Sequence, residues 1–206
     1  QWDTALQDLN NRFALRTGNI TIASMPSFAS NLLPSALMQF KTQHPKVKVA
    51  LHDVIAEEVV RMVRTGQAEV GVSFDPGIHD DLIFTPLFND HFMAVLSQDH
   101  PLATQSSIEL KQLMQHDLIT LQAPSQVRQL ISDMLTREEL EFNPAMEAHH
   151  LVTIGRMVAN GLGVSIVPAL CEQQMQEVGA VCRPLSHTVL SQHVGIITRR
   201  RYPLSV

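Results

Sequence analysis

The sequence predicts an α/β fold built from two lobes that are joined by two crossing strands. Three observations lead to this prediction. Over the 206 residues a β-α-β-α-β order occurs twice, the loops between elements are short, and 45% of the residues are hydrophobic, as in a globular protein. Alternating strands and helices with short connections form parallel sheets with right-handed crossovers. Each lobe, of about 90 residues, is therefore expected to contain a parallel sheet covered by helices.

The chain opens with residues spaced as in an amphipathic helix. Within 1–17, one apolar stripe is formed by Trp2, Leu6, Leu9 and Phe13. Gly18 follows as a C-terminal cap. Because so short a helix is marginal by itself in water, we interpret 1–17 as the end of a longer helix.

In the first lobe, apolar and polar residues alternate where strands are expected and recur at helical spacing between them. A strand at 18–24 is followed by a turn at Met25-Pro26-Ser27 and by a helix from Leu32 to Phe40. Pro34 should lie in the first turn of this helix, and His44-Pro45 should end it. The later elements are a half-exposed strand at 46–54, a helix at 56–66 capped by Gly66, a buried strand at 68–74, and strands at 82–88 and 91–97 separated by a turn at Asn89-Asp90.

The second lobe repeats this order with shorter elements. The expected helices lie at 108–113, at 125–140 with Ser125 as its N-cap, at 151–160 and at 169–175. The expected strands lie at 117–121, at 143–148 as an edge strand, at 163–168, at 179–185 and at 189–200. The strands near 91–97 and 189–198 are the two that should connect the lobes.

Composition and charge argue against several classes of protein. Acidic residues outnumber basic ones by 20 to 15, so this chain lacks the Lys/Arg excess that phosphate neutralisation requires. The basic run Arg199-Arg200-Arg201 is more typical of a solvated tail. No apolar run approaches the ~20 residues that span a bilayer. Cys171 and Cys182 lack C-x-x-C spacing, which favours reduced, buried thiols in a cytoplasmic protein; an exported chain without its signal peptide would have a similar composition.

The motifs of catalysis and metal binding are missing from the sequence. Neither a G-x-S-x-G elbow nor a P-loop occurs, and the lone G-x-G at Gly161 connects a helix to a strand, the wrong order for a dinucleotide site. His149 and His150 are adjacent, which does not suit chelation of a metal. The pairs Glu57-Glu58 and Glu138-Glu139 are typical of solvated helix surfaces. We therefore expect neither an enzyme nor a metal or cofactor site.

Two strand-to-helix junctions have the small polar residues of a ligand site. Helix N-termini expose unpaired N–H groups, and ligands of such sheets bind at the carboxyl ends of the strands. The junctions are Ser24–Ser27 in the first lobe and Thr120–Ser125 in the second. Two further strands end at Ser73-Phe74 and at Val167-Pro168, and these residues would form additional walls of the ligand site. An N-cap or core role remains an alternative for each of these residues.

Several stretches resemble one family. They are GNITIAS, LLPSALMQFKTQHPKVKVALHD, VVRMVRTGQAEVGVSF, PLFNDHFMAVLSQDHPLA and MVANGLGVSIVP. From about Gly18 to Arg200 the chain is similar to the effector-binding domain of LysR-type transcriptional regulators. The resemblance implies two Rossmann-like lobes of the kind found in type 2 periplasmic binding proteins, with a small-molecule effector between them and no other cofactor. It also implies a homodimer or homotetramer that contacts DNA through an N-terminal winged helix-turn-helix domain, which this chain lacks.

The resemblance also assigns domains and site residues. Residues 1–17 would end the linker helix, 18–97 with 189–206 would form lobe I, and 98–188 would form lobe II. Ala56 stands where many members have a polar contact residue, and Phe74 where some sensors of aromatic acids have an arginine, so a strongly carboxylate-dependent effector is not favoured. The full expected effector site is Ser24, Pro26, Ser27, Phe28, Ala56, Ser73, Phe74, Thr120, Ser125, His149, Val167 and Pro168.

The functional hypothesis is a cytoplasmic sensor domain that binds an effector in the interlobe cleft and modulates transcription. The alternative with the same architecture is a periplasmic solute-binding protein of a transporter. A bilobal enzyme is disfavoured because catalytic groups are missing. A helix-turn-helix segment encoded upstream of Gln1 would favour the regulator, and a signal peptide would favour the transporter component.

Overall fold

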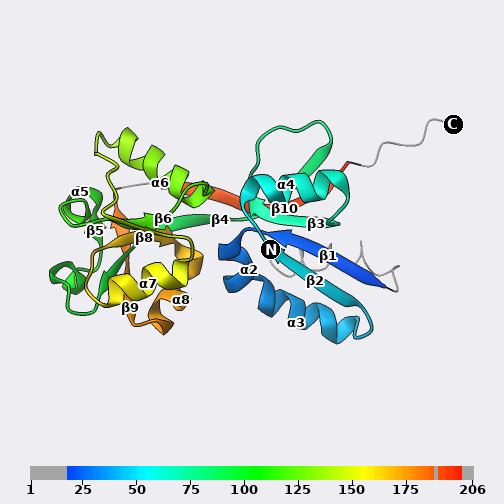
Figure 1. The fold of residues 1–206 in the computed structure, drawn as a ribbon, viewed down its shortest axis with the longest axis horizontal. Helices are drawn as coiled ribbons and strands as arrows, with labels where there is room; N and C mark the ends of the chain where they lie inside the picture. The colour runs from blue at the N-terminus through cyan, green and yellow to red at the C-terminus, as the bar shows by residue number, and fades with distance from the viewer. Residues whose placement is uncertain (1–17, 188–189, 201–206) are drawn as a thin grey trace. The chain divides into compact units, whose positions relative to one another are not determined.

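The computed structural model describes residues 18–187 and 190–200, which fall into two compact units (Figure 1). The first unit runs to Asn89 and resumes at Gln192, and the second runs from Asp90 to Ser191. The helix expected at 1–17 lies outside the described residues. None of the helices in the described ranges is long and apolar enough to cross a membrane.

The first unit contains a mixed sheet with the strand order β2-β1-β3-β10. Its first three strands are parallel, as expected, but β10 runs antiparallel to β3. In Figure 1, α4 lies on one face of these strands, and α2 and α3 lie on the other. The bounds are β1 (Asn19–Ser24), α2 (Pro26–Asn31), α3 (Leu33–Gln43), β2 (Lys48–Asp53), α4 (Ala56–Thr65), β3 (Val70–Phe74) and β10 (Ser191–Arg199).

Helix boundaries in this unit follow proline and glycine chemistry. The turn expected at Met25–Ser27 is wrong, because Pro26 starts α2 as its first residue, a position where the missing N–H costs nothing. Pro34 lies in the first turn of α3, as expected. A continuous helix through Leu32 would set the Pro34 ring against the carbonyl of Ser30, which accounts for two helices here. Gly66 caps α4 in the left-handed conformation with φ +78°.

The second unit contains a mixed sheet in which β4 pairs antiparallel with both β8 and β9. Among the described residues of this unit, the parallel pairs are β5 with β9, β6 with β7, and a bridge between Leu118 and Val164. The expectation of parallel sheets is therefore wrong at both crossing strands, β4 and β10, which pair antiparallel with their neighbours. The strands are β4 (Leu82–Ser97), β5 (Ile108–Glu109), β6 (Ile119–Leu121), β7 (Met146–Ala148), β8 (Ser165–Pro168) and β9 (Ala180–Ser186).

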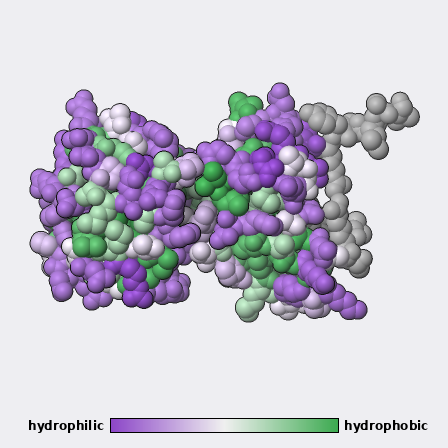
Figure 2. Space-filling model, in the orientation of Figure 1, coloured by the Kyte–Doolittle hydropathy of each residue, from purple (hydrophilic) through white to green (hydrophobic). Residues whose placement is uncertain are grey.

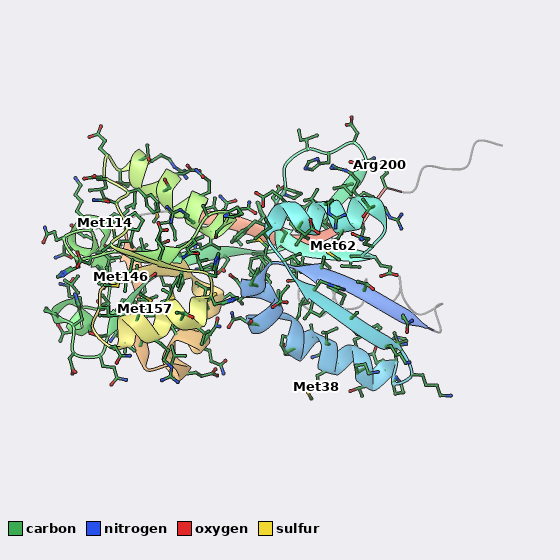
Figure 3. All side chains as sticks on the ribbon, in the orientation of Figure 1. Met38, Met62, Met114, Met146, Met157 and Arg200 are labelled. Carbon is green, nitrogen blue, oxygen red and sulfur yellow. The ribbon has the colours of Figure 1, made fainter. Side chains whose placement is uncertain are left out.

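The helices of the second unit enclose its core. α7 and α8 lie on one side of the strands and α6 on the other (Figure 1). Val95, Ile154 and Met175 belong to the buried cluster, against which Met146 and Met157, labelled in Figure 3, are packed. Residues 108–109, expected to start a helix, instead form β5. The helices are η1 (Pro101–Thr104), α5 (Leu110–Leu113), α6 (Gln126–Arg137), α7 (Leu151–Ala159), η2 (Ala169–Cys171) and α8 (Glu172–Glu177).

β4 is one continuous strand of 16 residues rather than two strands separated by a turn. Asn-Asp is a frequent turn pair, but the side chain of Asp90 is buried within the strand and not exposed as in a turn. Its carboxylate accepts the N–H of His91 at 3.0 Å and that of Leu170 at 3.4 Å. The chain passes from the first unit to the second at this point, between Asn89 and Asp90.

β10 also has β4 as a neighbour in the sheet, and Gly195 of β10 tests this pairing. A Cβ at Gly195 would overlap the carbonyl oxygen of Thr85 and lie 2.6 Å from the Phe84 ring. We expect Gly195→Ala to lower the free energy of unfolding by about 1–3 kcal/mol in urea titration, because a backbone oxygen cannot move aside cheaply. His193→Ala, an exposed change on the same strand, should stay within about 0.5 kcal/mol. Equal stability of Gly195→Ala and wild type would contradict this packing.

His100 makes the second unit sensitive to pH. Its Nδ1 accepts the N–H of Leu102 at 3.1 Å and caps η1, and its ring centroid lies 4.4 Å from that of His116. Burial, and secondarily the charge of His116, lower the pKa of His100 below its ordinary value of 6.5. The folded chain thus binds fewer protons here than the unfolded chain, and stability is lost progressively as pH falls from 6.5 to the lowered pKa.

We therefore expect thermal melts to show a smaller loss of stability with acidification in His100→Asn than in wild type. Asn keeps an oxygen that can cap η1 but does not titrate. Identical pH profiles for the two proteins would argue against a neutral His100 cap.

Candidate functional site

In the first unit, the carboxyl ends of β1 and β3 bring two expected site residues to one edge. The parallel register sets Ser24 opposite Val72, next to Ser73. Both serine side chains are buried, and each hydroxyl reaches Met25. Ser24 Oγ donates to the Met25 carbonyl at 3.0 Å, and Ser73 Oγ donates to Met25 Sδ at 3.4 Å. These two hydroxyls therefore already have protein partners.

The first turn of α2 lies against the same edge. Met25 N donates to the Val72 carbonyl at 3.1 Å, which fixes the start of the helix on β3. Ser27 is only 4% exposed, whereas Pro26 is exposed. Ala56 is buried at the first position of α4. Its methyl group offers no hydrogen bond, so polar contacts on this side would come from α2 and the strand ends.

Phe28 of α2 and Phe74 at the end of β3 form a buried aromatic contact next to these serines. Their rings are edge-to-face, with centroids 5.1 Å apart and planes at 84°. Both side chains are fully buried. This contact ties α2 to the last residue of β3 and holds the neighbouring Ser27 in position.

In the second unit, β6 and β8 run in the same direction and end at a common edge. Ser165 Oγ donates to the Ile119 carbonyl at 2.6 Å and links the two strands. Thr120 is 2% exposed, and among the described residues its Oγ1 is the buried side-chain polar atom that has no hydrogen-bond partner. An unpaired buried hydroxyl costs free energy, so a site that leaves one open points to a ligand.

The other expected residues of the second unit differ in their surroundings. Ser125 Oγ accepts the N–H of Arg128 at 3.2 Å, the N-cap role that was the alternative for this residue. His149 is exposed, just before the N-cap of α7. Val167 belongs to the buried hydrophobic cluster, and Pro168, also buried, ends β8. The expectation that these residues and those of the first unit share one cleft stays a prediction.

Sequence reasoning missed two charged residues at this edge. Arg128 Nη1 donates to the Leu121 carbonyl at 2.8 Å and to Glu147 Oε1 at 2.7 Å, and its guanidinium lies 4.9 Å from the centre of the Phe142 ring. These contacts fix α6 on the carboxyl end of β6. The sequence feature that could have indicated Arg128 is its place three positions after the predicted N-cap, Ser125. Asp90 was missed because Asn-Asp was interpreted as a turn.

Titration of buried groups does not point to catalysis. Burial raises the pKa of Cys182 to about 12, with a further contribution from the charge of Glu172, so its thiol is protonated at neutral pH. Cys171 and Cys182 are both buried and not disulfide-bonded. Within residues 18–187 and 190–200, no group of three or more His, Cys, Asp or Glu side chains could hold a metal ion. Hydroxyls, backbone N–H groups and aromatic rings at strand ends suit reversible binding of a small polar molecule.

Comparison with known proteins gives consistent matches. The family model described as LysR substrate binding domain matches residues 14–206. The uncharacterized HTH-type transcriptional regulator YbhD of Escherichia coli (strain K12) is 27% identical over 205 residues, which cover 100% of this chain and 65% of that protein. The chain therefore spans less than two thirds of this relative.

Solved structures show the same fold. The effector binding domain of QuiR in complex with shikimate superposes with a TM-score of 0.80 at 15% identity, covering 92% of this chain and 91% of that one. The regulatory domain of CcmR from Synechocystis PCC6803 in complex with 2-PG gives 0.79 at 18% identity, covering 92% and 91%. At such low identity these likenesses establish the fold alone.

Thr120→Val tests the unpaired hydroxyl. Valine has nearly the same shape and removes a polar group without a partner, so we expect the free energy of unfolding to rise by about 1 kcal/mol in chemical denaturation. Ser165→Ala is the matched control, because it removes a hydroxyl that is bonded to Ile119 and should lower stability by a similar amount. A loss of stability in Thr120→Val would show that this hydroxyl has a partner in the folded chain.

Proposed function

The chain belongs to the LysR substrate binding domain family, and from this membership we propose that it is the effector-sensing domain of a transcriptional regulator. The observation that carries the proposal is the match of the family model over residues 14–206. The family comprises transcriptional regulators and not enzymes, in agreement with the sequence analysis. The same match argues against the alternative of a periplasmic solute-binding protein.

We propose that the effector is bound by residues at the strand ends of both units. In the first unit these are Ser24, Pro26, Ser27, Phe28, Ala56, Ser73 and Phe74. In the second unit they are Thr120, Ser125, His149, Val167 and Pro168. Support comes from the buried, unpartnered hydroxyl of Thr120 and from the buried Ser27 in the first turn of α2.

The proposed effector is a small polar metabolite, and no further cofactor is required. Two structural neighbours hold molecules of this kind, shikimate in QuiR and 2-PG in CcmR. Serine and threonine hydroxyls both donate and accept, so they suit hydroxyl and carboxylate groups alike. Effector binding shifts the regulator between two conformational states only to the extent that the effector binds one state more tightly than the other.

The remaining assignments concern the complete protein. We propose that it is cytoplasmic, that it contacts DNA through an N-terminal winged helix-turn-helix domain outside this chain, and that it works as a homodimer or homotetramer. The relatives' names, HTH-type transcriptional regulators, support the DNA-binding part. Hydrophobic residues in the region of α3 in Figure 2, and the 74% exposed Met38 labelled on α3 in Figure 3, support self-association.

A screen of metabolites by thermal shift, followed by calorimetry, tests this proposal. We expect at least one small polar compound to raise the melting temperature, since a ligand at about 100 times its Kd adds about 2.7 kcal/mol of stability. Ser27→Ala should weaken binding of that compound by about 1–3 kcal/mol if its hydroxyl meets a polar group of the ligand. Ser107→Ala, an exposed change outside the proposed site residues, is the control.

Two results would contradict the proposal. One is a broad screen of amino acids, sugars, hydroxy acids and aromatic acids without any stabilising compound. The other is a compound whose Kd is the same for wild type, Ser27→Ala and Thr120→Val.

A further inference from the structure

Asp90 is a buried acid that lies beyond the carboxyl end of β8. It is 5% exposed and stands two residues before Phe92, which pairs with Pro168, the last residue of β8. Because β4 and β8 are antiparallel, Asp90 extends past that end, and its Oδ2 accepts the N–H of Leu170 at 3.4 Å. The carboxylate thus sits at the strand-end edge of the second unit.

This edge is the one that contains Thr120. β6 and β8 are neighbours in the same direction, joined at Leu118 and Val164 and by the bond from Ser165 to Ile119. β8 lies in turn beside β4. With neighbouring strands about 4.8 Å apart, β6 and β4 are about 10 Å apart across β8. The register sets Thr120 level with Ile166 and Ala94, so Asp90 lies four residues farther along β4 than Thr120, toward the carboxyl end of β8.

The carboxylate of Asp90 is poorly compensated for its burial. Its hydrogen bonds come from two backbone groups, His91 N at 3.0 Å and Leu170 N at 3.4 Å. The ion pairs among the described residues do not include Asp90. An ionised carboxylate has about four acceptor positions, so about half of them are open. Burial raises the pKa of Asp90, and the two N–H groups together with the charge of His91 only partly offset that effect.

Capping of η2 does not account for a charged side chain here. An amide oxygen also accepts a backbone N–H, more weakly than a carboxylate oxygen but without the cost of burying a charge. A buried carboxyl group outside the ion pairs of the described residues, on a sheet that also holds an unpaired buried hydroxyl, is typical of a binding site.

We propose that Asp90 is a further effector-binding residue, whose carboxylate accepts a hydrogen bond from an ammonium or hydroxyl group of the effector. This inference rests on the proposed function, and it narrows the ligand class to small molecules that carry such a donor. Hydrogen bonds to a charged group contribute more than neutral ones, so Asp90 would set specificity for the donor.

Asp90→Asn is the test of the charge. Asparagine keeps an oxygen for the shorter bond, from His91 N, and removes the uncompensated charge, so we expect a melting temperature within about 4 °C of wild type. A larger drop would assign the carboxylate to the stability of the fold and overturn the inference.

The binding experiment begins with the wild-type protein, to find a probe that binds, and then compares the variants. Calorimetry compares probes in pairs that differ by one donor. Amino acids against their deaminated acids test the ammonium group, and hydroxy acids, shikimate included, against their deoxy counterparts test the hydroxyl group. We expect one donor-bearing probe to bind at least about tenfold more tightly than its counterpart, and Asp90→Asn to lose most of this difference. Thr120→Val is the control and should weaken both members of the pair alike.

The outcomes separate this inference from the proposed function. A probe that binds wild type and Asp90→Asn equally, or whose donor makes no difference, would overturn the role of Asp90 and leave the sensor function standing. If no probe in the panel binds wild type, the proposed function fails, and the role of Asp90 fails with it.

Discussion

Parallel pairing of neighbouring strands is the constraint on which the candidate site depends. It directs the carboxyl ends of β1 and β3 to one edge of the first unit, and those of β6 and β8 to one edge of the second. Short polar side chains placed at these ends then gather without any sequence motif of their own. The helices that follow, α2 and α6, begin at the same edges because a strand in such a unit leads directly into its crossover helix.

Polar groups at these edges differ in how far the protein satisfies them. Ser24, Ser73 and Ser165 have internal partners, and such hydroxyls hold the edges together. The hydroxyl of Thr120 and half of the acceptor positions of Asp90 are left open. Buried polar groups without partners destabilise a fold, so their persistence at strand ends is the physical argument that these edges are built for a ligand.

The sequence predicted most elements because periodicity reports burial directly. Ile20 and Ile22 alternate as their strand requires, and α4 ends at Gly66 as its composition indicates. Errors arose where local preference and tertiary packing disagree. Asn89-Asp90 favours a turn, but burial of Asp90 in β4 overrides that preference. The antiparallel direction of the crossing strands β4 and β10 was also missed, because the alternation of apolar and polar residues is the same whether a neighbouring strand is parallel or antiparallel. Site residues could be placed at strand ends by their position, whereas the open state of the Thr120 hydroxyl and the contacts of Arg128 depend on neighbours far away in sequence.

A crystal structure of the chain with its tightest-binding metabolite tests the central claim most directly. The quantity to measure is the distance from Thr120 Oγ1 to the nearest polar atom of the ligand. The account predicts a hydrogen bond of about 2.7–3.0 Å. A ligand bound away from the carboxyl ends of β6 and β8, with Thr120 Oγ1 still unpartnered, would contradict it.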